Sequence, residues 1–173
     1  MQGHHRAFGT TANAPGNVGK RRSTRTTRQD KFFERFEPCI EGADLLIQKR
    51  ADGKYHSARL WANTCCTHPL WGEPVDQSAK RRLQEELGFT TALKPAHVIT
   101  YRAPVSNGLI EHEQVHVFRG ELADDSLIIP NEEEVSAVRW STPAALQAAA
   151  RRTPGEFAPW FRIYLERWPE LGL

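Results

Sequence analysis

The sequence predicts an α/β (α+β) fold, with helices packed on both faces of a mixed sheet. Short apolar runs of strand length are interspersed with longer segments in which apolar residues recur at helical spacing, as expected of a sheet covered by helices. Of the 173 residues 39% are hydrophobic, and after about residue 40 the large apolar ones are spread along the chain. A chain of this length and composition buries one core, so we expect a single domain over residues 41–173.

Residues 1–40 differ from the rest in charge and composition. They carry eight Lys or Arg against three Asp or Glu, whereas residues 41–173 carry fifteen against eighteen. From Gly9 to Arg28 the chain is rich in Thr, Arg, Gly and Asn and almost devoid of large apolar residues. We therefore expect 1–40 to be a basic, disordered segment, with order beginning near Phe36 or Gly42. A basic stretch can bind nucleic acid, but this one lacks interleaved aromatic residues, so we expect no nucleic-acid partner.

Strands and helices are predicted in the following order along the domain. The segments with the length and composition of strands are Ala43–Lys49, Arg59–Thr64, His97–Ala103, Leu109–Leu122 and Glu134–Ser141. The segments with helical character are Val75–Leu87, Pro143–Arg152 and Phe157–Trp168.

The helix over Val75–Leu87 is the clearest element. Every fourth residue is apolar, which makes one continuous stripe. Pro74 suits the first turn of a helix and Gly88 suits its end. On the polar side, the pairs Arg81–Glu85 and Arg82–Glu86 have the spacing of helix ion pairs.

Composition also indicates the cellular compartment of the protein. No apolar run approaches the roughly 20 residues that a membrane helix needs, and the first residues lack the apolar stretch of a secretory signal. The three cysteines, two of them adjacent at Cys65 and Cys66, make neither a disulfide framework nor a Cys-x-x-Cys metal pair, which favours a reducing compartment. We expect a cytoplasmic protein with no membrane partner, as a monomer or weak homo-oligomer.

The first chemical motif is Cys66-Thr67-His68-Pro69. A thiol and an imidazole two residues apart can act as nucleophile and base, or as acid and metal ligand. The alternative is a small buried cysteine beside a hydrogen-bonded loop histidine.

The second motif is a pair of glutamates on one strand. Glu111 and Glu113 share a face because strand side chains alternate, and that face continues into Val115 and Val117. Two carboxylates on an apolar face are costly unless a cation or a proton accompanies them, and a metal ion would serve. The alternative is a solvated strand face with tolerated acids.

The third motif lies on the predicted helix. Its late glutamates can hold Mg²⁺, which in turn can bind a diphosphate, because hard cations prefer oxygen ligands. Arg50, Lys54 and Arg82 could complete the grip on the diphosphate. A charged helix face without a ligand is the alternative.

Together these segments resemble one known family. The run from Glu73 to Phe89 resembles the Nudix box, in which a Glu precedes Arg-Glu-hydrophobic-x-Glu-Glu-x-Gly-hydrophobic by seven residues. Here Arg82 replaces a box Glu and Thr67 replaces its first Gly, and the first of these changes is typical of the type 1 isopentenyl-diphosphate isomerases. Further matches to that branch are Trp61-Ala62-Asn63-Thr64-Cys65-Cys66-Thr67-His68-Pro69, Tyr101-Arg102-Ala103, Glu111-His112-Glu113, Ala158-Pro159-Trp160 and the Lys-Tyr-His-Ser run at 54–57. The resemblance covers about residues 43–168 and implies a Nudix-like mixed sheet.

The resemblance also implies an activity and the residues that carry it. The reaction converts isopentenyl diphosphate to dimethylallyl diphosphate for isoprenoid biosynthesis, by protonation of the alkene on one face and proton removal on the other. Cys66 and Glu113 match the acid and base, Tyr101 a hydroxyl that assists near Glu113, and Trp160 an indole that stabilises the cation. For the metals, the matching ligands are His5, His68, Glu111 and Glu113 for a divalent ion (zinc, manganese or magnesium) and Glu86 for a diphosphate-bound Mg²⁺. For the substrate's diphosphate, the matching positive residues are Arg50, Lys54 and Arg82.

The resemblance fails at the front of the chain. His5-Arg6-Ala7-Phe8 matches the start of a His-x-Ala-Phe strand, but the family's other N-terminal histidine and a substrate-binding lysine have no counterpart. Residues 9–40 stand in place of an apolar strand, through an insertion or, as we favour, through a shifted reading frame. Peptide mapping of the native protein that finds 9–40 as written would contradict the shift. If residues 9–40 are present in the protein as written, we expect a sheet without an edge strand and a metal site of weakened affinity.

Two alternatives to an active isomerase remain. One is a Nudix pyrophosphohydrolase acting on a nucleoside diphosphate, which Arg82 argues against. The other is a degenerate isomerase relative with impaired activity.

Because Thr67 stands where relatives have Gly, we also expect a positive φ there, which a β-branched residue resists.

Overall fold

The structure is a computed structural model that describes residues 25–35, 44–105, 108–122 and 125–171, with the backbone alone for 25–35. Its strands are β1 (Arg25–Arg35), β2 (Asp44–Arg50), β3 (Trp61–Asn63), β4 (Cys65–Thr67), β5 (Leu93–Pro104), β6 (Ile110–Glu121) and β7 (Val135–Ser141). Its helices are α1 (Val75–Leu87), α2 (Pro143–Arg152) and α3 (Pro159–Glu166), with single 3-10 turns at Asp125–Leu127, Pro154–Glu156 and Trp168–Glu170.

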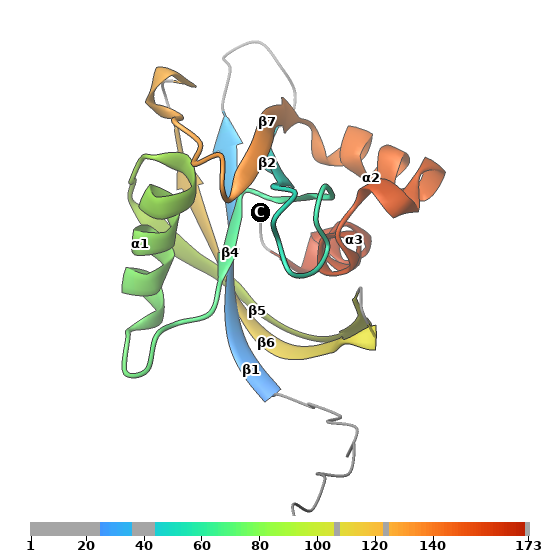
Figure 1. Cartoon of the computed structure of the whole chain (residues 1–173), viewed down its shortest axis with the longest axis horizontal. Helices are drawn as coiled ribbons and strands as arrows, with labels where there is room; N and C mark the ends of the chain where they lie inside the picture. Colours follow the sequence, from blue (N-terminus) through green and yellow to red (C-terminus); the bar gives the residue numbers. More distant parts are fainter. Residues whose placement is uncertain (1–24, 36–43, 106–107, 123–124, 172–173) are drawn as a thin grey trace, which may run out of the picture.

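The strands form one mixed sheet, as the sequence predicts. The order is β3-β2-β1-β6-β5, with β4 paired to β1 and β7 paired to β2. Strand β1 runs parallel to β6, whereas the other pairings are antiparallel. In Figure 1, α1 lies on one side of the strands and α2 and α3 lie on the other.

Alternation along β2 shows that both faces of the sheet are covered. Leu45 and Ile47 belong to a buried cluster that includes residues of α2 and α3. Leu46, between them, belongs to a second cluster with Leu83 and Leu87 of α1. The expected arrangement, a sheet with helices on both faces, is therefore confirmed.

Helix α1 has the predicted bounds and a well-defined end. It follows Pro74 and ends at Gly88, whose φ of 78° is left-handed. A Cβ at Gly88 would lie 2.7 Å from the carbonyl oxygen of Ile129, so a side chain does not fit there. The amide of Ile129 donates to the oxygen of Leu87 at 2.9 Å, which ties the segment before β7 to the end of the helix.

The other predicted elements differ from the structure mainly at their ends. Strand β5 begins at Leu93 rather than His97, and α3 begins at Pro159 rather than Phe157. Phe157 and Ala158 are extended because they pair with Trp61, whose oxygen accepts from the amide of Ala158. The short strand β4 was not predicted, since three residues are too few to show a periodic pattern.

Strand β1 is the main correction to the sequence-based fold. Residues 1–40 were expected to be disordered, yet Arg25–Arg35 lies in the middle of the sheet, between β2 and β6. The expected disorder is therefore wrong for Arg25–Arg35, whereas the expected absence of an edge strand stays a prediction. The backbone of β1 pairs with β6 from Arg25 to Glu34, and this ladder does not depend on an apolar side-chain pattern. Residues 1–24 and 36–40 lie outside the described residues, and the boundary at residue 41 stays a prediction.

A second correction concerns Thr67. It lies in β4 with extended neighbours, and the only described non-glycine residues with positive φ are Ser57 and Arg59. The strain expected at Thr67 is therefore absent, because a strand residue of any type adopts this backbone.

Candidate active site

A cavity of about 280 Å³ opens between β4, the second half of α1 and the loop that joins β2 to β3. Three separate motifs meet there. The lining residues are Arg50, Lys54, Tyr55, His56, Cys66, Thr67, His68, Leu70, Arg81, Arg82, Glu86 and Glu111. Most of the site residues that the sequence singles out therefore share one hollow.

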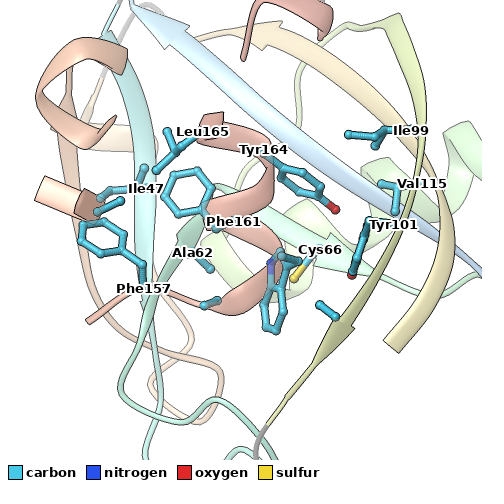
Figure 2. Close-up of a cluster of buried hydrophobic side chains, with 14 of the residues drawn as sticks. Ile47, Ala62, Cys66, Ile99, Tyr101, Val115, Phe157, Phe161, Tyr164 and Leu165 are labelled. Carbon is cyan, nitrogen blue, oxygen red and sulfur yellow. The ribbon is translucent and has the colours of Figure 1, made fainter. Parts of the chain in front are cut away.

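Strand alternation in β4 separates the two adjacent cysteines. Cys65 is fully buried in the cluster against α1. Cys66 points to the opposite face, where it lines the cavity and belongs to the cluster that contains Tyr101 and Trp160 (Figure 2). Of the two neighbours, only Cys66 can reach a molecule in the cavity.

Tyr101 links the two glutamates of β6. Its hydroxyl lies 2.8 Å from Oε2 of Glu111 and 2.9 Å from Oε2 of Glu113. The register pairs Tyr101 of β5 directly with Glu113 of β6, which sets this geometry. A tyrosine hydroxyl has one proton, so it donates to one carboxylate at a time. The pair is therefore arranged to share a proton or a cation.

A histidine lies at each side of this carboxylate pair. Nε2 of His68 is 3.0 Å from Oε1 of Glu113, and Nε2 of His56 is 3.5 Å from Oε1 of Glu111. His56 is buried, whereas the side chain of His68 is 43% exposed. His56 belongs to the Lys-Tyr-His-Ser run at 54–57, but no role was predicted for it, because a loop histidine alone gives no sequence signal of burial.

The donor chemistry around Glu113 fits a divalent cation. The side chains of Glu113 and Glu111 are only 5% and 10% exposed, and a buried carboxylate pair needs a compensating charge. Across the ranges that the structure describes, no three His, Cys, Asp or Glu side chains are placed as ligands of one metal ion. The remaining predicted ligand, His5, lies outside the described residues.

Trp160 forms the apolar wall next to the cavity. It is fully buried, and its indole N–H donates to Oδ1 of Asn63 at 3.2 Å. The guanidinium carbon of Arg50 lies 5.2 Å from the ring centroid. The indole face thus accepts positive charge already in this structure. Arg50 also joins this wall to the cationic part of the cavity.

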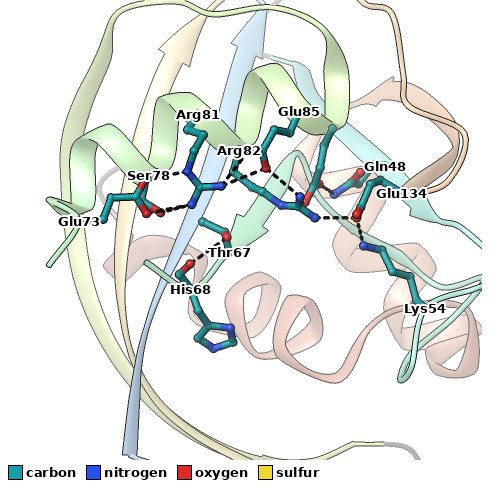
Figure 3. Close-up of polar contacts among 11 residues, drawn as sticks. Gln48, Lys54, Thr67, His68, Glu73, Ser78, Arg81, Arg82, Glu85 and Glu134 are labelled. Carbon is teal, nitrogen blue, oxygen red and sulfur yellow. Dashed lines mark hydrogen bonds and ion pairs between the residues drawn. The ribbon is translucent and has the colours of Figure 1, made fainter. Parts of the chain in front are cut away.

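The cationic part is centred on Arg82, which contacts carboxylates on three sides (Figure 3). Its Nε lies 2.9 Å from Glu86, its Nη1 donates to Glu85 at 3.0 Å, and its Nη2 donates to Glu134 at 2.6 Å. The carboxylate of Glu86 also accepts from Nε2 of the Gln48 side chain at 2.7 Å. The predicted ion pairs Arg81–Glu85 and Arg82–Glu86 are both confirmed.

Burial and charge act against each other at this end of the cavity. Burial lowers the pKa of Lys54, and the nearby Arg50 and Arg82 lower it further, while Glu86 acts in the opposite direction. Burial also opposes the charge of Arg82, but Glu86 and Glu85 outweigh it and raise the pKa of this guanidinium. The charged forms of Lys54 and Arg82 are therefore stabilised by nearby carboxylates.

The entrance to α1 is held by a separate ion pair. Arg81 donates from Nε and Nη2 to the carboxylate of Glu73 at 2.7 and 2.9 Å. The amide of Leu70 donates to the same carboxylate at 2.8 Å. These hydrogen bonds, that of Arg81 first, lower the pKa of Glu73 to about 2. The contacts tie the loop after His68 to the helix.

Comparisons with known proteins identify the family of the chain. The model of the NUDIX domain family matches residues 39–161. An isopentenyl-diphosphate Delta-isomerase of Dinoroseobacter shibae is 51% identical over 133 residues, which are 76% of this chain and 75% of the relative. The enzyme of the same name from Jannaschia sp. is 44% identical, over 76% of each chain.

Solved structures agree on the fold. A protein of Deinococcus radiodurans superposes with a TM-score of 0.65 at 18% identity, covering 87% of this chain and 88% of that one. A Nudix hydrolase from M. smegmatis gives 0.61, again at 18% identity, with 84% of each chain covered. At such identities the likeness concerns the fold alone.

None of the helices in the described ranges combines the length and apolar character that crossing a membrane requires.

Proposed function

This chain belongs to the isopentenyl-diphosphate Delta-isomerases of the NUDIX domain family, and we propose that it converts isopentenyl diphosphate to dimethylallyl diphosphate. The observation that carries the proposal is the composition of the cavity. It places Cys66 and Glu111 in the same hollow as Arg50, Lys54 and Arg82. A small molecule with a reactive hydrocarbon and an anionic end fits this division.

The reaction needs one proton added and one removed. A proton joins the terminal CH₂ of the alkene, which leaves positive charge on the tertiary carbon, and loss of a proton from the adjacent CH₂ forms the new double bond. We assign the two proton transfers to Cys66 and Glu113. The hydroxyl of Tyr101, which lies 2.9 Å from Glu113, would assist this proton transfer by hydrogen bonding to the carboxylate.

An apolar cluster next to the cavity suits the positive charge that develops. The indole of Trp160 is fully buried in this cluster, beside Phe161 and Tyr164. Exclusion of water protects a carbocation from capture, and the π-face attracts it. The position of Arg50 against this ring keeps the anionic end of a five-carbon substrate close to the indole.

The site also uses divalent metal. We assign Mg²⁺ to Glu86, and a zinc, manganese or magnesium ion to His68, Glu111 and Glu113, with His5 as a further ligand. Bound there, these ions supply positive charge for the diphosphate and for the buried carboxylates. We further propose that the enzyme acts in the cytoplasm on this small substrate, for isoprenoid precursor synthesis.

Hydrolysis of a pyrophosphate fits the site less well. The helix has Arg82 where the Nudix box has a Glu, so one of the carboxylates that would hold metal in a hydrolase is replaced by a cation. The Cys66 and Trp160 pair also has no task in hydrolysis.

The test is turnover by the purified 173-residue chain with Mg²⁺ and added Zn²⁺ or Mn²⁺, followed by NMR of the product. We expect dimethylallyl diphosphate and no phosphate release from nucleoside diphosphates. Phosphate release without isomerisation would favour the hydrolase. A folded chain that binds diphosphate without turnover would be a degenerate isomerase.

A further inference from the structure

Glu134 lies at the charged end of the cavity but belongs to none of the chemical motifs that the sequence shows. It sits just before β7, in an acidic run from Glu132 that resembles a solvated loop. Its backbone is fixed on two sides, because its oxygen accepts from the amide of Ala51 at 3.0 Å and its amide donates to Asn131 at 2.9 Å. The backbone amide of Asn131 in turn donates to the backbone oxygen of Glu86 at 2.9 Å. The carboxylate is therefore held in place relative to α1.

One oxygen of Glu134 serves two cations that come from different elements. Oε2 accepts from Nη2 of Arg82 at 2.6 Å and forms an ion pair with Nζ of Lys54. Figure 3 shows Glu134 between these two side chains. Both cations line the cavity, and each is about one-fifth exposed. No other carboxylate with a contact to Arg82 makes a direct ion pair with Lys54 among the described residues.

These are the contacts that an oxygen of a diphosphate would make with the same two side chains. Two cations that face one cavity repel each other, and a carboxylate between them offsets that repulsion. An incoming diphosphate must therefore compete with Glu134 for Lys54 and Arg82, or share them with it.

We propose that Glu134 is a built-in counter-ion, a positioning residue that occupies the place of a diphosphate oxygen between Lys54 and Arg82 and thereby weakens anion binding. While the cavity is empty, the carboxylate of Glu134 forms ion pairs with both cations, and these ion pairs form again when the product leaves. The inference rests on the proposed function only in taking diphosphate as the anion that the cavity receives.

The experiment is titration calorimetry of the full chain with inorganic diphosphate in EDTA at fixed ionic strength, so that metal does not contribute. For Glu134→Gln, which keeps the shape but removes the charge, we expect the Kd to fall about fivefold, the change that corresponds to one partly exposed ion pair. The matched control is Glu133→Gln, which removes the same charge from the exposed neighbouring residue and should change the Kd less than twofold. A purely structural role of Glu134 predicts the opposite sign, since loosened cations bind an anion less well.

An unchanged or higher Kd for Glu134→Gln would overturn the proposal, as would an equal fall for Glu133→Gln. If Glu134→Gln lacks a cooperative thermal transition, Glu134→Asp decides in its place. The shorter side chain cannot reach both cations, so a lower Kd supports the proposal and an unchanged or higher one overturns it.

Turnover separates this inference from the proposed function. In an active enzyme, Glu134→Gln should lower the KM for isopentenyl diphosphate without raising kcat. A wild-type chain without turnover whose diphosphate affinity still rises on Glu134→Gln would contradict the isomerase and leave the counter-ion intact. Turnover with no change in diphosphate affinity would contradict the counter-ion alone.

Discussion

At one end of the cavity the side chains are placed by strand alternation and apolar packing, whereas at the other end they are placed by ion pairs. Cys66 and Trp160 belong to a cluster of buried residues on one face of the sheet. Arg82 and Lys54 are held instead by carboxylates from α1 and from the loop before β7. Substitutions at the apolar end should therefore change the chemical step, and substitutions at the charged end should change binding of the diphosphate.

The largest effect is expected for Cys66→Ala. Loss of a proton-transferring group should lower kcat about 10³-fold. Affinity for inorganic diphosphate, measured by calorimetry, should stay within twofold, because Lys54 and Arg82 keep their ion pairs with Glu134 in this variant.

The adjacent thiol provides the matched control. Cys65→Ala removes the same atom on the other face of β4, in the cluster against α1, so it should lower Tm but keep kcat within about threefold. Equal loss of kcat in both variants would show that damage to β4, rather than the thiol of Cys66, causes the effect.

At the charged end, Arg82→Lys should raise the KM for isopentenyl diphosphate about tenfold, with a smaller change in kcat. A lysine has a single charged nitrogen and cannot contact Glu85, Glu86 and Glu134 together as the guanidinium does. Steady-state kinetics measures both constants.

Arg81→Lys is the control for this prediction. Arg81 is its neighbour on α1, but it contacts Glu73, just before the helix, and Glu85 of the helix itself. Its replacement should lower Tm more than it raises KM. If Arg81→Lys raised KM as much as Arg82→Lys, the separate role of Arg82 in binding diphosphate would be contradicted.

The smallest effect is expected at the entrance to α1, from Glu73→Gln. A carboxylate whose pKa falls from 4.5 to about 2 on folding stabilises the fold above pH 4.5, and this contribution is lost as the pH falls through about 2. The wild type should therefore have a higher Tm than Glu73→Gln near pH 6, and the difference should disappear toward pH 2. Thermal unfolding followed by circular dichroism at each pH measures it.

Glu133→Gln is the matched control for acid unfolding, since it removes an exposed carboxylate outside this ion pair. A Tm difference between wild type and Glu73→Gln that stays constant from pH 6 to pH 2 would contradict the assigned cause.

The sequence predicted the apolar end better than the charged end, for a physical reason. Alternation along a strand has a period of two, so the shared face of Glu111 and Glu113 followed from position alone. The contact of Tyr101 with both glutamates agrees with that prediction. The stripe from Val75 to Leu87 likewise gave the bounds of α1.

Residues whose partners lie far away in the chain could not be placed in this way. Glu134 meets Arg82 across 52 positions and Lys54 across 80, and nothing in its own neighbourhood marks it. His56 gave no local signal of its burial near Glu111. Strand β1 was missed for a related reason: its place is set by pairing with β6, whereas its own composition is that of a polar segment.

Both ends of the cavity serve one central claim, that the chain moves a double bond by adding one proton and removing another. Turnover of isopentenyl diphosphate in D₂O, followed by NMR, tests it most directly. The account predicts dimethylallyl diphosphate with deuterium in a methyl group, formed about 10³-fold more slowly by Cys66→Ala. Product formed in D₂O without deuterium would contradict the account, because the hydrogen would then have moved within the substrate rather than through the protein's acid.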